Sequence, residues 1–379
     1  MNVLTVNAGS SSLRLAAFVE QDKSLSLSAS GHFSGIPHDP AEILSAFLKD
    51  HDMGEVTAVA HRVVHGGSRL TAPCVLDHAV EAEIRRLAPL APLHNPVALK
   101  WVAACRAAFG ANAAQVAVFD TAFYATLPEV AAAYALPRAL CRKHGIRRYG
   151  FHGIAHQAMS RRWRVLHPQA QPGGCVISLQ LGAGCSITAV RDGCAVDTSM
   201  GFSPLEGLVM ATRGGDIDPG LLLFLQRAEG LTPEQMERLL NEESGLLGLS
   251  GASGDMRQLL AAEDDVAQLA VEVYCYRARK YVGAYLAALG GTQAILFGGG
   301  VGEHAPPVRA KILAGMHRLG IALDANANRA AIGTEALISR RGSEVEVWVI
   351  PVDEARILAE EAVAVVRPPA AMSCKGGKS

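Results

Sequence analysis

Residues 1–18, MNVLTVNAGSSSLRLAAF, contain the pattern on which the fold depends. Two apolar runs, 3–6 and 13–18, flank a short stretch of Asn, Ala, Gly and Ser, which predicts two strands joined by a tight turn. The small residues 9–12 offer backbone N–H groups and hydroxyls to an anion. The stretch is not a Walker A loop, which ends in Gly-Lys-Ser/Thr before a helix. Taken alone, it fits a surface hairpin as well as an anion site.

A second copy of this pattern lies in the middle of the chain: CVISLQLGAGCSITAVRDG, residues 175–193. When the two are aligned, residues 3–6 match 176–179, Asn7 falls on Gln180, and the turn again consists of small residues. Two copies indicate a duplicated domain, each half beginning with a turn of phosphate size. Two such turns facing a cleft would hold the phosphates of a nucleotide.

The composition restricts the class of protein. A length of 379 residues fits two domains, and 50% hydrophobic residues are enough for two cores. A net charge of −1 gives no general attraction to nucleic acid or acidic membranes, so neither is expected as a partner. We expect no signal peptide, and no run approaches the roughly 18 apolar residues of a spanning helix. The 8 cysteines form no C-x-x-C pair and favour a reducing cytoplasm.

Strands alternate with helices along the chain, which indicates an α/β protein. Helix signals include a capping box with Pro233 at the first helical position and Gly290 after a long apolar pattern. The expected elements are helices over 97–109, 233–240, 264–289 and 354–366, and strands over 294–297 and 345–350. The tail, 367–379, is expected to fray.

Two motifs resemble known ligand sites without matching them. The glycine run GGGVGEH, 298–304, follows a strand and precedes a helix but lacks the third glycine of the dinucleotide fingerprint. It fits nucleotide contact and simple strand–helix packing equally well. The pairs His61/His65 and His152/His156 have a zinc-like spacing. Neither pair has the Glu of H-E-x-x-H, which disfavours zinc.

Five segments place charged residues among Gly, Pro and apolar residues, which is unusual for a solvated surface. They indicate polar groups lining a cleft, with buried ion pairs as the alternative. The segments are HRVVHGG (61–67), APLHNP (91–96), VFDTAF (118–123), YGFHG (149–153) and DTSMGFSPLEGLVMATRGGDIDP (197–219).

These segments, with NAGSSSLR, GDMR and GGVGEH, occur in an order that closely resembles the acetate kinase family, from residue 1 to about 366. The resemblance implies the α/β fold of acetate and sugar kinases, Hsc70 and actin, with a duplicated ribonuclease H-like core and an interdomain cleft. It implies an N-terminal domain of 1–122 plus 355–379 and a nucleotide-binding domain of 123–354. A homodimer is also implied.

The implied reaction is reversible transfer of a phosphoryl group from ATP to acetate by direct in-line attack, giving acetyl phosphate and ADP, with Mg²⁺ or Mn²⁺. General chemistry agrees with it. Phosphoryl transfer requires mainly positioning and charge neutralisation. A carboxylate nucleophile is already ionised at pH 7, so no strong base is needed.

The resemblance also implies roles for single residues. Arg62 and Arg213 bind acetate and the transferring phosphoryl group, and His152 donates to an equatorial oxygen. Asp120 lies against the reacting centre or its metal, and Asn7 and Glu354 hold the metal directly or through water. The acid-binding residues are Val64, Leu93, His94, Phe151 and Pro204. The nucleotide-binding residues are Arg14, Gln180, Leu181, Gly182, Ala183, Gly184, Asp255, Met256, Arg257, Gly300, Val301, Gly302, Glu303 and His304.

The departures from the family pattern all lie on the phosphoryl-donor side. The family's second turn, H-L-G-N-G-S-S, is Q-L-G-A-G-C-S at 180–186, and its T-A-G-I-G-E-N loop is GGGVGEH at 298–304; Arg14 replaces a Lys. Two alternatives therefore stay open: a kinase for propionate or another short acid, and an acetate kinase with a donor such as pyrophosphate. A catalytically silent binding or regulatory relative is disfavoured, because the residues implied for catalysis and metal are intact.

The altered turn generates a first prediction. Ala183 lacks the side-chain donor of the family's Asn, and each lost hydrogen bond to a charged group costs roughly 1.5–3 kcal/mol. We expect a high KM for ATP beside an ordinary KM for acetate. The double variant Gln180→His with Ala183→Asn should tighten ATP about ten- to a hundredfold and leave acetate nearly unchanged. Steady-state kinetics measure both constants. An unchanged KM for ATP would mean that this turn does not bind the donor.

Overall fold

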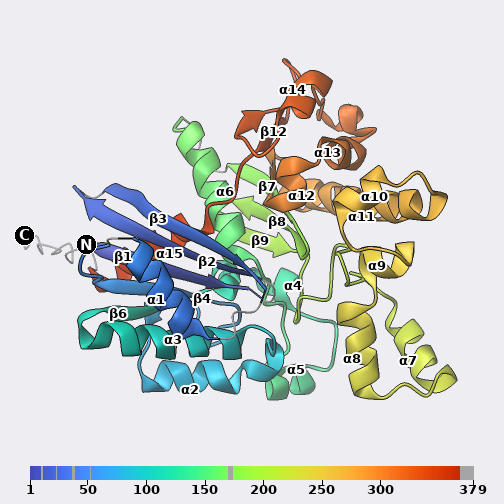
Figure 1. Ribbon diagram of the computed structural model, residues 1–379. Coiled ribbons are helices and arrows are strands. Elements are labelled where there is room, and N and C mark those ends of the chain that lie inside the picture. Colours follow the sequence, from blue (N-terminus) through green and yellow to red (C-terminus); the bar gives the residue numbers. More distant parts are fainter. Residues whose placement is uncertain (10–11, 23, 36–38, 52, 170–173, 368–379) are drawn as a thin grey trace, which may run out of the picture. The chain divides into compact units, whose positions relative to one another are not determined.

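The computed structural model describes residues 1–379 except 10–11, 23, 36–38, 52, 170–173 and 368–379 (Figure 1). The chain divides into two compact units, Met1–Ala122 with Glu354–Ser379, and Phe123–Asp353. The expected boundary assigned Glu354 to the second domain. The structure assigns it to the first unit, because it is the first residue of the helix that returns there.

The first unit is built on one six-stranded sheet in the order β3-β2-β1-β4-β6-β5. Strands β1, β4 and β6 are parallel, and β2, β3 and β5 pair antiparallel to their neighbours. Helix α15 contacts β1, β4 and β6, while α1 and α3 pack together. Its elements are β1 (Asn2–Ala8), β2 (Ser12–Gln21), β3 (Ser24–Ser34), α1 (Pro40–Asp50), β4 (Ala58–Val63), β5 (Cys74–Val75), α2 (His78–Arg86), α3 (Asn95–Phe109), β6 (Ala114–Phe119) and α15 (Glu354–Val366), with 3₁₀ turns η1 (Ala88–Leu90), η2 (Gly110–Asn112) and η3 (Asp120–Tyr124).

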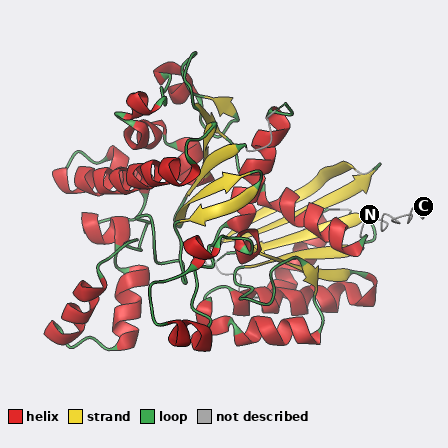
Figure 2. Ribbon diagram, turned by 180° about the vertical axis from the view of Figure 1, so that it is seen from behind, coloured by secondary structure: helices red, strands yellow, loops and turns green. Residues whose placement is uncertain are grey.

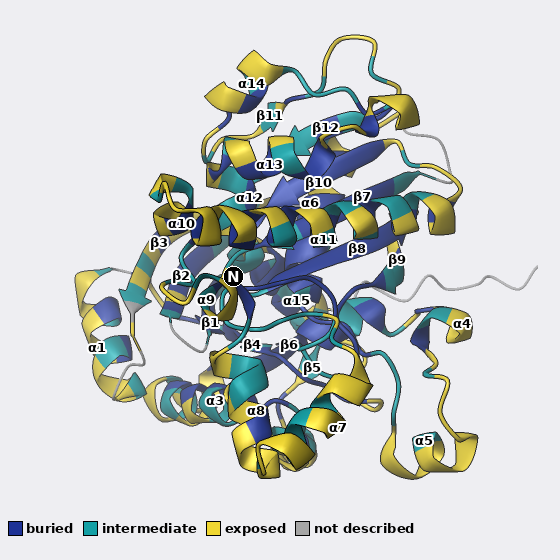
Figure 3. Cartoon of the chain, turned by 90° about the vertical axis from the view of Figure 1, so that its right-hand side faces the viewer, coloured by how far each residue is buried: buried dark blue, intermediate teal, exposed yellow. Residues whose placement is uncertain are grey.

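The second unit contains a sheet in the order β11-β12-β10-β7-β8-β9. Its central strands β7, β8 and β10 are largely buried (Figure 3). Its elements are α4 (Glu129–Ala132), α5 (Arg138–His144), α6 (Gly153–Leu166), β7 (Cys175–Leu181), β8 (Cys185–Arg191), β9 (Cys194–Thr198), α7 (Pro219–Ala228), α8 (Pro233–Glu242), α9 (Gly245–Ser250), α10 (Met256–Ala261), α11 (Asp265–Leu289), β10 (Ala294–Gly298), α12 (Gly299–His304), α13 (Pro306–Leu313), η4 (Met316–Leu319), α14 (Ala325–Ala330), β11 (Ala336–Leu337) and β12 (Glu346–Val349).

The two sheets, whose strands are yellow in Figure 2, repeat one topology by their strand order. In each, three antiparallel strands (β1–β3, β7–β9) are followed by two strands parallel to the first (β4 and β6, β10 and β12). In each, a two-residue strand then pairs antiparallel with the last. Asn7 pairs with Arg14 in the first hairpin, and Gln180 pairs with Ser186 in the second. The duplication expected from the two hairpins is confirmed.

Local signals set most helix ends. The Thr232 side chain accepts from the Gln235 N–H and the Gln235 side chain accepts from the Thr232 N–H, which is the capping box predicted for α8. Asp264 caps α11, and Gly290 in the left-handed region ends it. Among the described residues, no helix is both long and apolar enough to cross a membrane.

The interpretation of 298–304 as a loop was wrong, because residues Gly299–His304 form α12 directly after β10. The Glu303 carboxylate accepts from the Gly299 N–H (2.9 Å) and from the Val352 N–H (3.1 Å). An acceptor at a helix start stabilises the unpaired N–H groups there. This contact stabilises a glycine-rich turn of helix that intrinsic propensity disfavours.

Three histidines are buried in the two units as neutral groups. Burial lowers the pKa of His61 and His65 to about 4 and that of His156 to about 3. His61 Nε2 lies 2.7 Å from Gln115 Oε1, so it has a structural partner. None of the three carries charge near neutral pH in the folded protein.

These histidines make stability depend on pH. Their pKa values in the folded protein lie below the 6.5 of a free histidine, so the unfolded chain binds protons first. Their contribution is complete above pH 6.5 and is lost as the pH falls towards 4, by roughly 4 kcal/mol per pH unit for the three together. Thermal midpoints should therefore change little above pH 7 and fall steeply below about pH 6.5. His61→Asn should weaken this dependence, and His78→Asn, at an exposed position, should not. A midpoint independent of pH would contradict the assignment.

Candidate active site

Three adjacent parallel strands of the first unit end in polar side chains at the same edge of the sheet. Asn7 is the second-to-last residue of β1, Arg62 lies near the end of β4, and Asp120 directly follows β6. The fourth member, Glu354, begins α15. We call Asn7, Arg62, Asp120 and Glu354 the strand-end cluster. Ligands of open α/β sheets bind at this edge, because the carboxyl ends of the strands leave their side chains accessible there.

The members of this cluster contact one another directly. Arg62 Nη2 lies 2.6 Å from Asp120 Oδ2, and Arg62 Nη1 donates to Asn7 Oδ1 at 3.1 Å. Asn7 Nδ2 in turn donates to Glu354 Oε2 at 2.5 Å. Burial by itself lowers the pKa of Arg62, but Asp120 and Glu354 outweigh it and hold that pKa above its usual value. The guanidinium is a permanent cation with 13% of its side chain exposed, and the Asp120 side chain is 1% exposed.

The segment after β4 is fixed by the start of α3. The Asn95 side chain accepts from the His65 N–H (3.1 Å) and donates to the His65 carbonyl (3.0 Å). The His65 ring accepts from the Gly67 N–H at Nδ1 (3.0 Å). Buried hydrogen bonds between His65 and Asn95 therefore join the motifs HRVVHGG and LHNP beside Val64. The two histidines of this zinc-like pair have hydrogen-bond partners within the protein.

A second group of residues gathers at the turn between β7 and β8 in the second unit. A Cβ atom built on Gly184 would lie 2.7 Å from Arg213 Nη2 and 3.3 Å from His152 Nε2. Both side chains therefore reach the backbone of this turn, and a Cβ atom at this position would displace the Arg213 guanidinium. His152 caps α6 with φ 58°, a left-handed conformation that is uncommon for residues other than glycine. We call His152, Gly184, Ser186 and Arg213 the turn cluster.

Arg213 differs from Arg62 in its partners. Its Nη1 donates to the Pro204 carbonyl at 2.8 Å, and within the described residues no carboxylate forms an ion pair with it. Burial lowers the pKa of Arg213 below its usual value. A half-buried guanidinium without an anion is costly, and a bound anion would relieve that cost.

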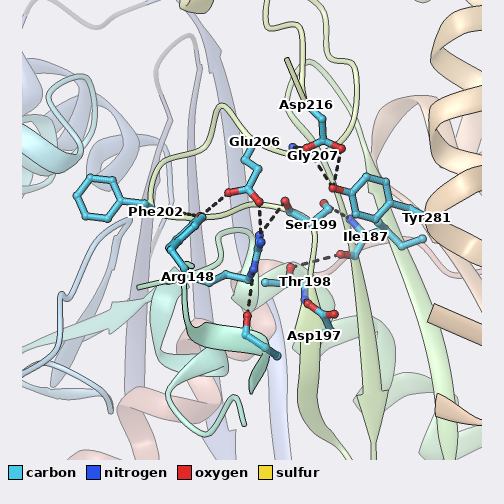
Figure 4. A network of polar contacts seen from close by, with 12 residues as sticks. Arg148, Ile187, Asp197, Thr198, Ser199, Phe202, Glu206, Gly207, Asp216 and Tyr281 are labelled. Carbon is cyan, nitrogen blue, oxygen red and sulfur yellow. Dashed lines mark hydrogen bonds and ion pairs between the residues drawn. The ribbon is translucent and has the colours of Figure 1, made fainter. Parts of the chain in front are cut away.

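The loop that carries Pro204 and Arg213 is held in place by two carboxylates (Figure 4). Glu206 accepts from Arg148 Nη2 (2.6 Å) and from the Tyr134 hydroxyl, and Arg148 also donates to the Ser199 carbonyl at 3.2 Å. Asp216 accepts from the Gly207 N–H (2.8 Å) and from the Tyr281 hydroxyl (2.9 Å). These contacts fix the position of the loop that carries Pro204 and Arg213.

The residues expected around the acid lie in both units. Val64 is buried, Leu93 is 57% exposed and His94 caps α3, all in the first unit. In the second unit, Phe151 is buried and its carbonyl accepts from the Tyr124 hydroxyl (2.7 Å), and Pro204 is half-buried. Leu93 is a large apolar side chain open to solvent beside the polar His94.

The residues expected around the nucleotide divide into two groups. Gln180, at the end of β7, pairs with Gly298 at the end of β10, so the turn 182–184 and helix α12 lie side by side. Gly299 is so close to the Gln180 side chain that a Cβ atom would meet its amide at 3.0 Å. The Gln180 Oε1 atom is buried with no hydrogen-bond partner among the described residues.

Other predicted nucleotide contacts are already engaged in the protein. Asp255 caps α10 and pairs with Arg257 (2.7 Å), which is exposed, while Met256 is buried. The Glu303 carboxylate binds backbone N–H groups, as described above. The remaining members, Leu181, Ala183, Gly300, Val301, Gly302 and His304, lie at the end of β7, in its turn or on α12.

The predicted anion turn of the first hairpin falls partly outside the described residues, because it includes Ser10 and Ser11. The Gly9 N–H donates to the Ser12 carbonyl (2.8 Å), and the Gly182 N–H donates to the Gly184 carbonyl (3.1 Å). Neither N–H is therefore available to a phosphate in this conformation. Arg14 is exposed on β2 opposite Asn7.

Sequence reasoning missed several residues that support the site. Ser178, Ser186 and His156 form a buried chain behind His152, and Arg148, Glu206 and Asp216 hold the loop of Arg213. A signal existed for Glu206 and Asp216, because both lie within the quoted segment 197–219 among small and apolar residues, and Arg148 directly precedes the quoted segment 149–153. Ser178 carried no such signal, since a serine in a strand is ordinary.

Comparisons with known proteins agree with this geometry. The family model described as the acetokinase family matches residues 32–360. An acetate kinase of Chloroherpeton thalassium is 49% identical over 312 residues, which is 81% of this chain and 75% of that protein.

Solved structures agree as well. The acetate kinase of Porphyromonas gingivalis has a TM-score of 0.87 at 37% identity, covering 97% of this chain and 100% of that one. A propionate kinase of Francisella tularensis has a TM-score of 0.86 at 34% identity, covering 96% and 99%. With a strand-end cluster, a turn cluster and a duplicated fold of this kind, the chain belongs to the acetokinase family.

Proposed function

We propose that this chain transfers a phosphoryl group reversibly between ATP and acetate, giving acetyl phosphate and ADP. The observation that carries the proposal is Arg213, a half-buried guanidinium beside His152 with no ion-pair partner in the part of the chain described. Transfer of a phosphoryl group spreads negative charge over its equatorial oxygens, and fixed donors aimed at that charge lower the barrier. Arg213 and the His152 ring provide such donors.

The strand-end cluster has a different role. Arg62 is held by Asp120 and Asn7, so its guanidinium is oriented before any substrate binds. A guanidinium can bind a carboxylate with two parallel hydrogen bonds. We assign Arg62 to the acid and the group that it receives. Val64, Leu93, Phe151 and Pro204 are the apolar residues proposed to contact the methyl group.

The strand-end cluster also fits a divalent cation held mainly by substrate phosphates. Mg²⁺ is usually bound through one or two carboxylates together with phosphates and water, and Asp120 and Glu354 supply two. Among the described residues, no group of three or more His, Cys, Asp and Glu side chains is arranged to hold a metal ion. When bound, Mg²⁺ would neutralise phosphate charge. Asn7 and Glu354 would hold it, directly or through water.

The phosphoryl donor, the metal, the cellular location and the oligomeric state are proposed on separate grounds. We propose ATP as the phosphoryl donor and Mg²⁺ as the metal, since the chain belongs to the acetokinase family. The family expectation of a homodimer and the cysteine-based expectation of a cytoplasmic location both stay predictions. Six of the described cysteines are free thiols, which is compatible with a reducing compartment: Cys74, Cys105, Cys141, Cys185, Cys194 and Cys275.

The arginines provide one test. Arg62→Ala and Arg213→Ala should each lower kcat by about 10²-fold or more, because a donor aimed at developing charge is worth roughly 2.7–4 kcal/mol. Lysine should restore little, since a point charge does not reproduce the planar fork. Arg227→Ala, at an exposed position on α7, is the matched control and should leave kcat unchanged. Turnover of Arg213→Ala close to wild type would remove the basis of the proposal.

A panel of substrates tests the identity of both partners. Purified protein is assayed with acetate and propionate against ATP and pyrophosphate. We expect acetate with ATP to give the highest kcat/KM, with acetate preferred over propionate by about 10–200-fold at most, the range for one methylene. A higher kcat/KM for propionate would make the chain a propionate kinase. Activity with pyrophosphate but none with ATP would change the donor.

A further inference from the structure

A chain of hydrogen bonds runs behind His152 through the interior of the second unit. His152 Nδ1 lies 3.0 Å from Ser186 Oγ, and Ser186 Oγ lies 2.7 Å from His156 Nε2. His156 Nδ1 lies 2.7 Å from Ser178 Oγ. Ser178, Ser186 and His156 are fully buried. Because buried polar hydrogens are almost always paired, the protons of this chain can be assigned by counting donors and acceptors.

The Ser178 hydroxyl determines which ring nitrogen of His156 carries the proton. His156 carries one ring proton, since burial lowers its pKa to about 3. If that proton were on Nδ1, it would go to Ser178 Oγ, and the Ser178 hydroxyl proton would need another acceptor. Within the described residues, His156 Nδ1 is the one partner of Ser178 Oγ. The Ser178 hydroxyl therefore donates to Nδ1, and the proton of His156 is on Nε2.

The remaining bonds follow from this assignment. His156 Nε2–H donates to Ser186 Oγ, and the Ser186 hydroxyl then donates to His152 Nδ1. A ring nitrogen that accepts a hydrogen bond carries no proton, so His152 carries its proton on Nε2. That nitrogen lies on the side of Gly184 and Arg213, where a Cβ atom on Gly184 would approach both.

We propose that Ser178, His156 and Ser186 are positioning residues that fix His152 as the neutral Nε2–H tautomer, with this N–H directed into the turn cluster as a donor to the transferring group. The role of the donor rests on the proposed phosphoryl transfer, whereas the tautomer does not. Arg213 is a cation beside this ring, and burial raises the pKa of the neighbouring Cys185 thiol, so that thiol is uncharged at pH 7.

The tautomers can be read directly from the nitrogen-15 signals of the histidine rings in the whole protein at pH 7.5, assigned with His152→Gln and His156→Gln variants. We expect both rings as Nε2–H. Ser178→Ala removes the first donor without touching His152, and should convert His152 from one tautomer to a mixture. Ser178→Thr keeps the hydroxyl and should restore the single tautomer. Ser160→Ala removes a hydroxyl that, among the described residues, donates to the His156 carbonyl alone (2.8 Å), and it should change nothing.

Kinetics supply the second measurement. Ser178→Ala should lower kcat by about tenfold with little change in the KM for acetate, and Ser178→Thr should recover it. A proton on His152 Nδ1 in the wild type, or a His152 signal unaffected by Ser178→Ala, would overturn the inference. Correct tautomers in a protein that transfers no phosphoryl group would instead overturn the proposed function and leave the positioning chain intact.

Discussion

The ion pair between Arg62 and Asp120 depends on the parallel pairing of β4 and β6. Arg62 pairs with Val118 in register, so the residue that follows β6 meets the end of β4. A sequence separation of 58 residues is thereby reduced to a contact of 2.6 Å. The same edge brings Asn7 from β1, and α15 adds Glu354 from the far end of the chain. The sheet therefore orients a cation and two carboxylates without any bound ligand.

The second unit repeats the sheet and uses its strand ends differently. Its first hairpin has a shorter turn, and Gly184 in that turn leaves room for Arg213 and His152. In the first unit the guanidinium is neutralised by a carboxylate, whereas in the second it meets a carbonyl. An arrangement of this kind costs stability in the free protein and favours binding of an anion. Each unit therefore contains an arginine with a proposed function: Arg62 is neutralised by a carboxylate of the protein, and Arg213 contacts a carbonyl.

Sequence patterns predicted the secondary-structure elements whose ends and periodicity are determined by neighbouring residues. The two hairpins and the helices α3, α8 and α11 were predicted from hydrophobic periodicity and capping residues, and the structure confirms them. The prediction for 298–304 was wrong because a carboxylate four residues along stabilises a helix start that glycine propensity argues against. The quoted motifs identified the segments that carry Arg62, Asp120, His152 and Arg213. Spacing alone could not show that Ser178 lies against His156, 22 residues away, or that Arg148 pairs with Glu206 across 58 residues.

Arg213 has no ion-pair partner among the described residues, and we interpret it as an anion-binding residue. Thermal midpoints of the wild type and Arg213→Met, with and without acetyl phosphate, test this interpretation directly. We expect Arg213→Met without ligand to be at least as stable as the wild type, because a costly half-buried charge is removed. We also expect that acetyl phosphate raises the midpoint of the wild type and not that of the variant, since a ligand stabilises only a protein that binds it. A variant that is clearly less stable than the wild type, yet still stabilised by acetyl phosphate, would show that Arg213 is a structural residue and would contradict the account.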